Sequence, residues 1–221
     1  MKKLLIFTIM SCLIGCAPKY KSVEQYAEDM KAVQQKHKSY TLELEHLTSV
    51  ADTYYRVYKK NNLWKSELSA NHGRAFLFTV LFDGKDVVAY GNSGQSATIL
   101  DPQTARTNGG DASENLFNWN EPKGEGIPQF VNNKEQKNGF DCRLIKYGDS
   151  YEVCVNDTLG IAVYVKRKIT ENSEIIINLI KADTAELPDS IFVLPDNKQK
   201  IAAEQMLEKF SKQAQNTKKQ E

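Results

Sequence analysis

The chain of 221 residues lacks an apolar run long enough to cross a bilayer as a helix. Such a helix needs about 20 consecutive apolar residues, whereas the N-terminal run at residues 4–14 has eleven. Lys2 and Lys3 precede this run and small residues end it, which is typical of a secretory signal peptide. We therefore expect residues 1–15 to be an export signal that the mature protein loses.

The sequence also lacks an excess of charge of either sign, with 29 Lys and Arg against 28 Asp and Glu. Loss of residues 1–15 would leave 27 basic residues and a formal charge of −1. Nucleic-acid-binding proteins usually carry a strongly basic surface, so we expect no nucleic acid as partner. At 41% apolar and 26% charged residues, the composition is that of a globular chain. The roughly 200 mature residues suffice for one domain with a sizeable core.

Residues suited to catalysis or metal binding are scarce. The three histidines, His37, His46 and His72, are separated by nine and twenty-six residues, a spacing that matches no metal-ligand motif. The stretch Gly91-Asn92-Ser93-Gly94 superficially resembles a nucleophile elbow, but its second glycine comes one position early and no helix follows. We therefore expect no catalytic residue, no metal site and no cofactor, and predict that the protein is not an enzyme.

Cysteine is rare too, and one of the four cysteines ends the N-terminal apolar run. Leu13-Ile14-Gly15-Cys16 resembles the bacterial lipobox, which implies a diacylglyceryl thioether on Cys16, cleavage before it and acylation of the new amino terminus. An ordinary cleavage site with a chance cysteine is the alternative. Two or more acyl chains hold a protein stably on a membrane, so Cys16 is the predicted anchor.

The residues after Cys16 predict which membrane holds the protein and how far its domain can reach from that membrane. Ala17 is not the Asp that some bacteria use for inner-membrane retention, so we expect a lipid-anchored envelope protein that faces the periplasm, in the outer rather than the inner membrane. The tether of residues 17–21 spans at most ~17 Å, at about 3.5 Å per residue. The domain would therefore work at the membrane that holds it.

The other two cysteines of the mature chain flank a turn. Residues 140–146 and 151–157 are rich in β-formers, and Tyr-Gly-Asp-Ser at 147–150 is turn material. A hairpin folded about Gly148 would place Cys142 opposite Cys154, close enough for a disulfide bond, and an oxidising periplasm permits one. Two reduced core thiols are the alternative.

The remaining pattern predicts an α+β domain over residues 22–214, followed by a polar tail at 215–221. Ser22 and Gln25 form a capping box that opens a helix ending near His37. The polar segment 101–139 contains a short helix at 112–119 with its own capping box at Asp111, and a last helix begins near Lys198. The pattern predicts ten antiparallel strands, at residues 40–46, 53–59, 62–69, 75–82, 86–91, 96–100, 140–146, 151–157, 161–169 and 174–182.

The order of these elements and four stretches resemble the LolA/LolB-like group of lipoprotein-sorting proteins and their membrane-anchored relatives. The stretches are FDGKDVVAY, NGFDCRLI, VCVNDTLGIAVYV and LPDSIFVLP, and the resemblance covers residues 22–197. It implies a half-open antiparallel β-barrel, with helices lidding an apolar cavity that holds acyl chains. Cys154 stands where the family commonly has Trp, and the Arg and Lys side chains tied to the carrier lid have no match here. The residue-level mechanism of the carriers therefore does not transfer.

Residues that could line such a cavity lie on two predicted strands and in the middle segment. Both faces of residues 75–82 are apolar, so this strand must be covered twice, by a second layer and by a core or a ligand. Solid packing is the alternative, and the helix at 112–119 is either a moving lid or a fixed part of the core. The candidate ligand-binding residues are Trp64, Phe76, Phe78, Val80, Phe82, Leu116, Phe117 and Trp119.

These observations predict a membrane-anchored envelope lipoprotein that binds or transfers lipid or lipoprotein acyl chains. The alternative is a structural or assembly lipoprotein with a solid barrel that binds another envelope protein.

Overall fold

A computed structural model describes residues 20–70, 75–91, 95–101, 105, 111–121, 126–202 and 205. The predicted signal peptide, Cys16, its tether up to residue 19 and the polar tail lie outside the described residues, so their roles stay predictions.

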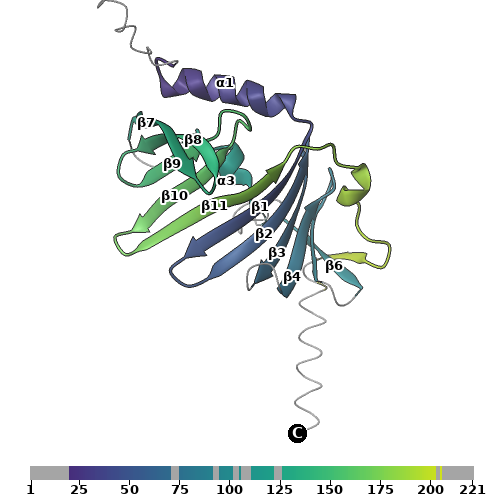
Figure 1. Cartoon of the computed structure of the whole chain (residues 1–221). Helices are drawn as coiled ribbons and strands as arrows, with labels where there is room; N and C mark the ends of the chain where they lie inside the picture. The colour runs from purple at the N-terminus through teal and green to yellow at the C-terminus, as the bar shows by residue number, and fades with distance from the viewer. Residues whose placement is uncertain are drawn as a thin grey trace, which may run out of the picture.

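Twelve strands of the described chain form one sheet in the order β12-β6-β5-β4-β3-β2-β1-β11-β10-β9-β8-β7. Neighbouring strands run antiparallel, except that β12 is parallel to β6. The strands are β1 (Ser39–Thr48), β2 (Asp52–Lys60), β3 (Leu63–Ala70), β4 (Ala75–Phe82), β5 (Val87–Gly91), β6 (Ser96–Leu100), β7 (Pro128–Lys137), β8 (Phe140–Tyr147), β9 (Tyr151–Val155), β10 (Ala162–Thr170), β11 (Ser173–Asp183) and β12 (Gln199–Ala202). Because β7 and β12 end the order, the sheet is open and does not close into a barrel (Figure 1).

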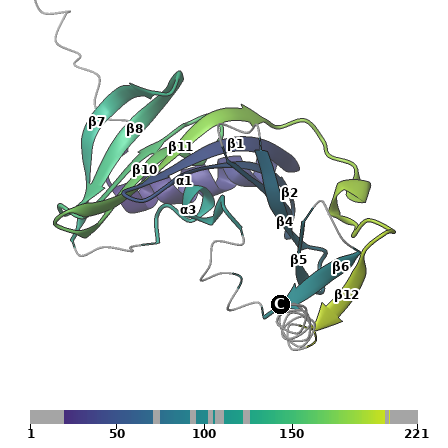
Figure 2. The same cartoon turned by 90° about the horizontal axis from the view of Figure 1, so that it is seen from below.

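The sheet bends into an arch, and two helices lie on its concave side (Figure 2). They are α1 (Val23–Lys36) and the single-turn α3 (Glu114–Phe117), and a 3-10 helix, η1 (Asp189–Phe192), lies outside the arch beside β12. We call the face that carries Leu42, Val57 and Val80 the inner face, since these residues pair across β1–β4 and the helices cover part of it. The opposite side is the outer face.

Helix α1 begins and packs as the sequence predicts. The hydroxyl of Ser22 accepts a hydrogen bond from the amide of Gln25 at 3.3 Å, which satisfies an otherwise unpaired donor at the helix start. Its buried stripe is Val23, Tyr26, Ala27 and Met30. The Tyr26 ring meets Trp119 at 5.7 Å and Phe130 at 5.6 Å between centroids, so α1 closes the β7–β10 half of the inner face.

Strand β4 is covered on both faces at Val80 and Leu81, as its apolar pattern predicts, whereas Leu77 and Phe78 are exposed. Val80 packs on the inner face with Ala105, and Leu81 packs on the outer face with Phe192 of η1. The outer cover is the segment that contains LPDSIFVLP, so the late proline-bounded stretch forms the second layer.

The structure corrects four expectations about local structure. There are twelve strands rather than ten, because β7 lies within the segment predicted as polar loop and β12 occupies the start of the helix predicted from Lys198. Most of that predicted helix beyond residue 202 lies outside the described residues. Ser113, not Asp111, is the N-cap residue of α3, and it makes no side-chain capping bond. The Asp111 carboxylate instead accepts from the Ser113 amide at 3.0 Å.

The fourth correction concerns the register of the cysteine hairpin. Cys142 and Cys154 do form a disulfide, with Cα atoms 5.4 Å apart. However, β9 pairs Cys154 with Leu144 rather than with Cys142. The turn is three residues long, with Gly148 in the left-handed region at a φ of 58°, so the register shifts by two residues and the bridge runs diagonally between the strands.

Candidate ligand-binding face

The inner face between β1 and β5 is built from cross-strand rows of side chains. Directly paired residues on one face of an antiparallel sheet are nearest neighbours. One row joins Leu44, Tyr55, Leu68 and Phe78 across β1, β2, β3 and β4. Its first members are buried or half-buried, whereas Phe78 is 40% exposed. The row therefore runs from the core to an apolar surface that solvent reaches.

Most of the strand residues predicted to bind ligand share this face. Val80 is buried, and Trp64 and Phe82 are half-buried with ring centroids 6.3 Å apart. Phe76 is half-buried, but the register between β3 and β4 shifts between Leu68 and Ser69, so a bulge separates Phe76 from Phe78. The structure brings four of the five strand candidates together and leaves Phe76 beyond an irregularity.

The middle-segment candidates lie deeper than a mobile lid would. Leu116 is 0% exposed and Trp119 is 1% exposed, both in the main core cluster. Phe117 is half-buried and packs edge-on against Tyr40, at 5.0 Å between centroids. This placement favours the fixed-core alternative for Leu116 and Trp119, while their part in ligand binding stays a prediction.

Two polar contacts hold residues 111–112 of the middle segment against the inner face. The ammonium of Lys59 lies 2.7 Å from the Asp111 carboxylate, and the Ala112 amide donates to the Ser66 hydroxyl at 3.3 Å. A backbone hydrogen bond at Ala112 also raises the pKa of His46, as an accepting carbonyl does. Strands β2 and β3 thus each supply one polar anchor for residues 111–112.

His46 is the functional candidate that sequence reasoning did not select. It continues the inward series of Tyr40, Leu42 and Leu44 on β1, and its ring contacts Tyr55 at 4.6 Å between centroids. Burial lowers the pKa of His46 to about 4, and the Ala112 hydrogen bond opposes this only in part. The imidazole is therefore neutral at neutral pH. The signal was present in the sequence, as a polar residue in an otherwise apolar alternation.

Within the described part of the chain, two buried side-chain polar atoms lack a hydrogen-bond partner, Nε2 of His46 and the hydroxyl of Tyr151. Both residues face the inner side. Pairing carries this face from His46 through Ile177 and Val165 to Val153 on β9, and Tyr151 lies two residues earlier on the same strand. Burial raises the pKa of Tyr151 well above its ordinary value.

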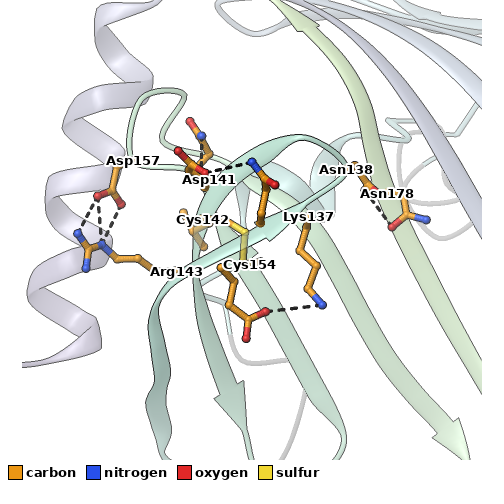
Figure 3. Close-up of a disulfide and its surroundings, with 12 residues drawn as sticks. Lys137, Asn138, Asp141, Cys142, Arg143, Cys154, Asp157 and Asn178 are labelled. Carbon is orange, nitrogen blue, oxygen red and sulfur yellow. Dashed lines mark hydrogen bonds and ion pairs between the residues drawn. A yellow bond between two sulfur atoms is a disulfide. The ribbon is translucent and has the colours of Figure 1, made fainter.

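Polar contacts beside the disulfide hairpin fix the other half of the arch to α1, and Figure 3 shows the disulfide and the Arg143–Asp157 pair. The Arg143 guanidinium makes a two-pronged pair with the Asp157 carboxylate, through Nε at 3.0 Å and Nη2 at 2.9 Å. The Tyr26 hydroxyl donates to the same carboxylate at 2.7 Å. Arg143 and Asp157 thereby link β8 and the loop after β9 to the helix, so this half of the inner face is closed by polar as well as apolar contacts.

The outer face carries a polar depression at the ends of β8–β11. Its charges alternate and neutralise one another, with Lys146 3.2 Å from Glu152 and Lys166 2.7 Å from Glu174. This surface does not suit an apolar chain. In the part of the chain that the structure describes, no helix has the length and apolarity needed to cross a membrane.

Comparison with known proteins bears on the fold. No protein-family model and no curated protein matches the sequence. An uncharacterized conserved protein from Thermus thermophilus superposes with a TM-score of 0.56 at 7% identity, over 81% of this chain and 98% of that one. MucB superposes with a TM-score of 0.53 at 10% identity, over 83% of this chain and 66% of MucB.

A LolA superfamily protein from Nitrosomonas europaea gives a TM-score of 0.43 at 14% identity, over 79% of this chain and 99% of that one. That score is too low to establish a shared fold. The two superpositions with TM-scores above 0.5 show that this chain shares its fold, an open and mostly antiparallel sheet with helices, with the Thermus protein and with MucB.

Proposed function

We propose that the protein is an envelope lipoprotein that binds or passes on acyl chains of lipids or lipoproteins on its inner face. The observation that carries this proposal is the half-exposed Phe78, at the end of a buried apolar row on the concave side of the sheet. Burial of each methylene stabilises a complex by about 0.8 kcal/mol. An acyl chain laid along Tyr55, Leu68 and Phe78 would therefore bind without a charged partner.

Other observations support the envelope setting. The disulfide between Cys142 and Cys154 suits an oxidising compartment. The resemblance of four sequence stretches to the LolA/LolB-like group points to the same ligand class. Lipidation of Cys16 would hold this domain close to the outer membrane, where it acts by binding rather than by catalysis.

A second function is a docking platform for another envelope protein. MucB, which shares the fold, also has a structure in complex with MucA. The closed half of the inner face, filled by α1, Leu116 and Trp119, favours this alternative because solid packing leaves no room for a chain there. The two functions differ in whether an acyl chain or a partner protein contacts Phe78.

Displacement of a fluorescent fatty acid tests the proposal. Phe78→Ser should weaken binding of the fatty acid about 5- to 10-fold, because burying a large apolar side chain is worth about 1.5–3 kcal/mol and Phe78 is half-exposed. The melting temperature should fall only slightly for the same reason.

The matched control is Val193→Ser. Val193 is 61% exposed at the end of η1, outside the arch, and its loss should leave affinity unchanged. Equal affinities of both variants and the parent protein would refute the proposed site. If the fatty acid does not bind at all, the docking function becomes the better account.

A further inference from the structure

The inner face holds a buried hydrogen-bond acceptor that the protein itself does not use. The Nε2 atom of His46 is buried and has no partner among the described residues. An unpaired buried polar atom is costly, and native proteins rarely keep one without a reason. The Ala112 backbone raises the pKa of His46, as a carbonyl that accepts a ring N–H does, and because Nε2 has no partner we assign this contact to Nδ1. Nε2 then carries a lone pair.

The position of His46 on the inner face indicates which kind of ligand group would donate a hydrogen bond to this lone pair. His46 follows Leu44 by two residues on β1, so it stands one step from the row that ends at Phe78. Its ring touches Tyr55, a member of that row, and its partners across the strands are Ile177 and Thr53. The apolar row that ends at the exposed Phe78 thus adjoins a single unpartnered polar atom.

We propose that His46 Nε2 accepts a hydrogen bond from a hydroxyl or amide N–H near the head of the bound acyl chain. This proposal rests on the function proposed above and adds the ligand's chemistry. The preferred ligand is an acyl or alkyl chain with a neutral hydrogen-bond donor at its head, such as a glycerol hydroxyl or an amide. A chain of equal length whose head accepts but does not donate binds less well, because it leaves Nε2 unpaired.

Tyr151 provides a matched control. Its hydroxyl is the other buried polar atom without a partner in the described chain, and it faces the same side of the sheet. The strands β11 and β10 separate it from β1, so it lies away from His46 and from the row that ends at Phe78. Loss of the Tyr151 hydroxyl should not alter head-group preference.

The experiment compares two probes with the same dodecyl chain, 1-dodecanol, whose head donates a hydrogen bond, and dodecyl methyl ether, whose head only accepts one, in displacement of a fluorescent fatty acid from the full chain. Wild type should bind the alcohol about 3- to 10-fold more tightly, the range that one hydrogen bond supplies. His46→Phe should abolish this preference while ether affinity stays within twofold. Tyr151→Phe should retain it.

The other possible results test the role of His46 and the proposed chain-binding function separately. Equal affinities of wild type for both probes would overturn the role of His46 while the proposed chain-binding function stands, whereas no displacement by either probe would overturn both. Preference lost in Tyr151→Phe but kept in His46→Phe would also overturn the role of His46. A buried water on Nε2 would satisfy the atom but would not distinguish the two probes.

A second measurement covers the case in which His46→Phe does not fold. The ¹⁵N chemical shift of His46 Nε2 in the wild-type protein should move on addition of dodecanol and stay unchanged on addition of the ether. Equal shifts with both probes would overturn the proposal.

Discussion

Replacing Gly160 by Ala should separate α1 from the sheet, and the cost follows from the contacts of that glycine. Gly160 is buried in the turn after β9 with a φ of +74°, and a Cβ there would lie 2.5 Å from the Met30 carbonyl oxygen and 2.9 Å from the Gln34 amide nitrogen. Both atoms belong to the α1 backbone, so the helix would have to move as a whole.

The expected loss has two parts. An L-residue in the left-handed region costs about 1–2 kcal/mol. The Gly160 carbonyl accepts hydrogen bonds from the Gln34 side chain at 2.9 Å and the Trp119 indole at 3.4 Å, and each is worth about 1 kcal/mol. Displacement of α1 would weaken both, for a total of about 3–4 kcal/mol, a large part of a typical stability of 5–15 kcal/mol.

Gly139→Ala is the control. Gly139 has a φ of +84°, but a Cβ there meets nothing within 4 Å, so only the conformational cost of about 1–2 kcal/mol applies. Equilibrium unfolding in urea of both variants and the parent measures the difference. Equal losses in Gly160→Ala and Gly139→Ala would refute the close packing of α1 on the loop after β9.

Four further predictions concern the disulfide, His46, Trp119 and Cys16. Replacing Cys142 and Cys154 by Ser should lower the free energy of unfolding by about 3 kcal/mol, measured in urea, and a non-reducing mass spectrum with two free thiols in wild type would exclude the bridge. The pKa of His46 is lowered to about 4 against an ordinary value near 6.5, so its contribution to stability is complete above pH 6.5 and is lost as the pH falls through 4. The melting temperature of His46→Phe should therefore fall less steeply with acid than that of wild type, and parallel curves would contradict this. Trp119→Ala should lower stability by about 3–5 kcal/mol if Trp119 is core, whereas an unchanged melting temperature with weaker chain binding would indicate a lid. Cys16→Ser should release the protein from the membrane fraction, and normal fractionation with unchanged mature mass would refute lipidation.

Strong local patterns made much of the fold predictable. The bounds of β4 and β6 agree with the sequence prediction, because their alternation and the turn residues around them are unambiguous. The edge strands were missed for a physical reason. β7 has the sequence PQFVNNKEQK and two register shifts, so it shows no period of two. β12 is four residues long and depends on pairing with β6, about a hundred residues earlier in the chain.

The sequence indicates the candidate site residues but not how deeply each of them is buried in the fold. An apolar strand such as β4 indicates that both faces are covered, yet the pattern cannot say that Phe192 covers Leu81 and that Phe78 stays half-exposed. The role of His46 was hidden for a related reason. Whether a lone histidine is satisfied depends on the contacts that a fold brings to it, here the backbone of Ala112 from the middle segment.

Cross-linking with a photoreactive fatty acid tests the central claim, that an acyl chain occupies the inner face, most directly. The full chain is irradiated with the probe, digested and mapped by mass spectrometry. We predict cross-links within β3 and β4, on peptides that contain Leu68 or Phe78, and competition by unlabelled fatty acid. Cross-links confined to the outer cover around Phe192, or no competition by unlabelled fatty acid, would contradict the account.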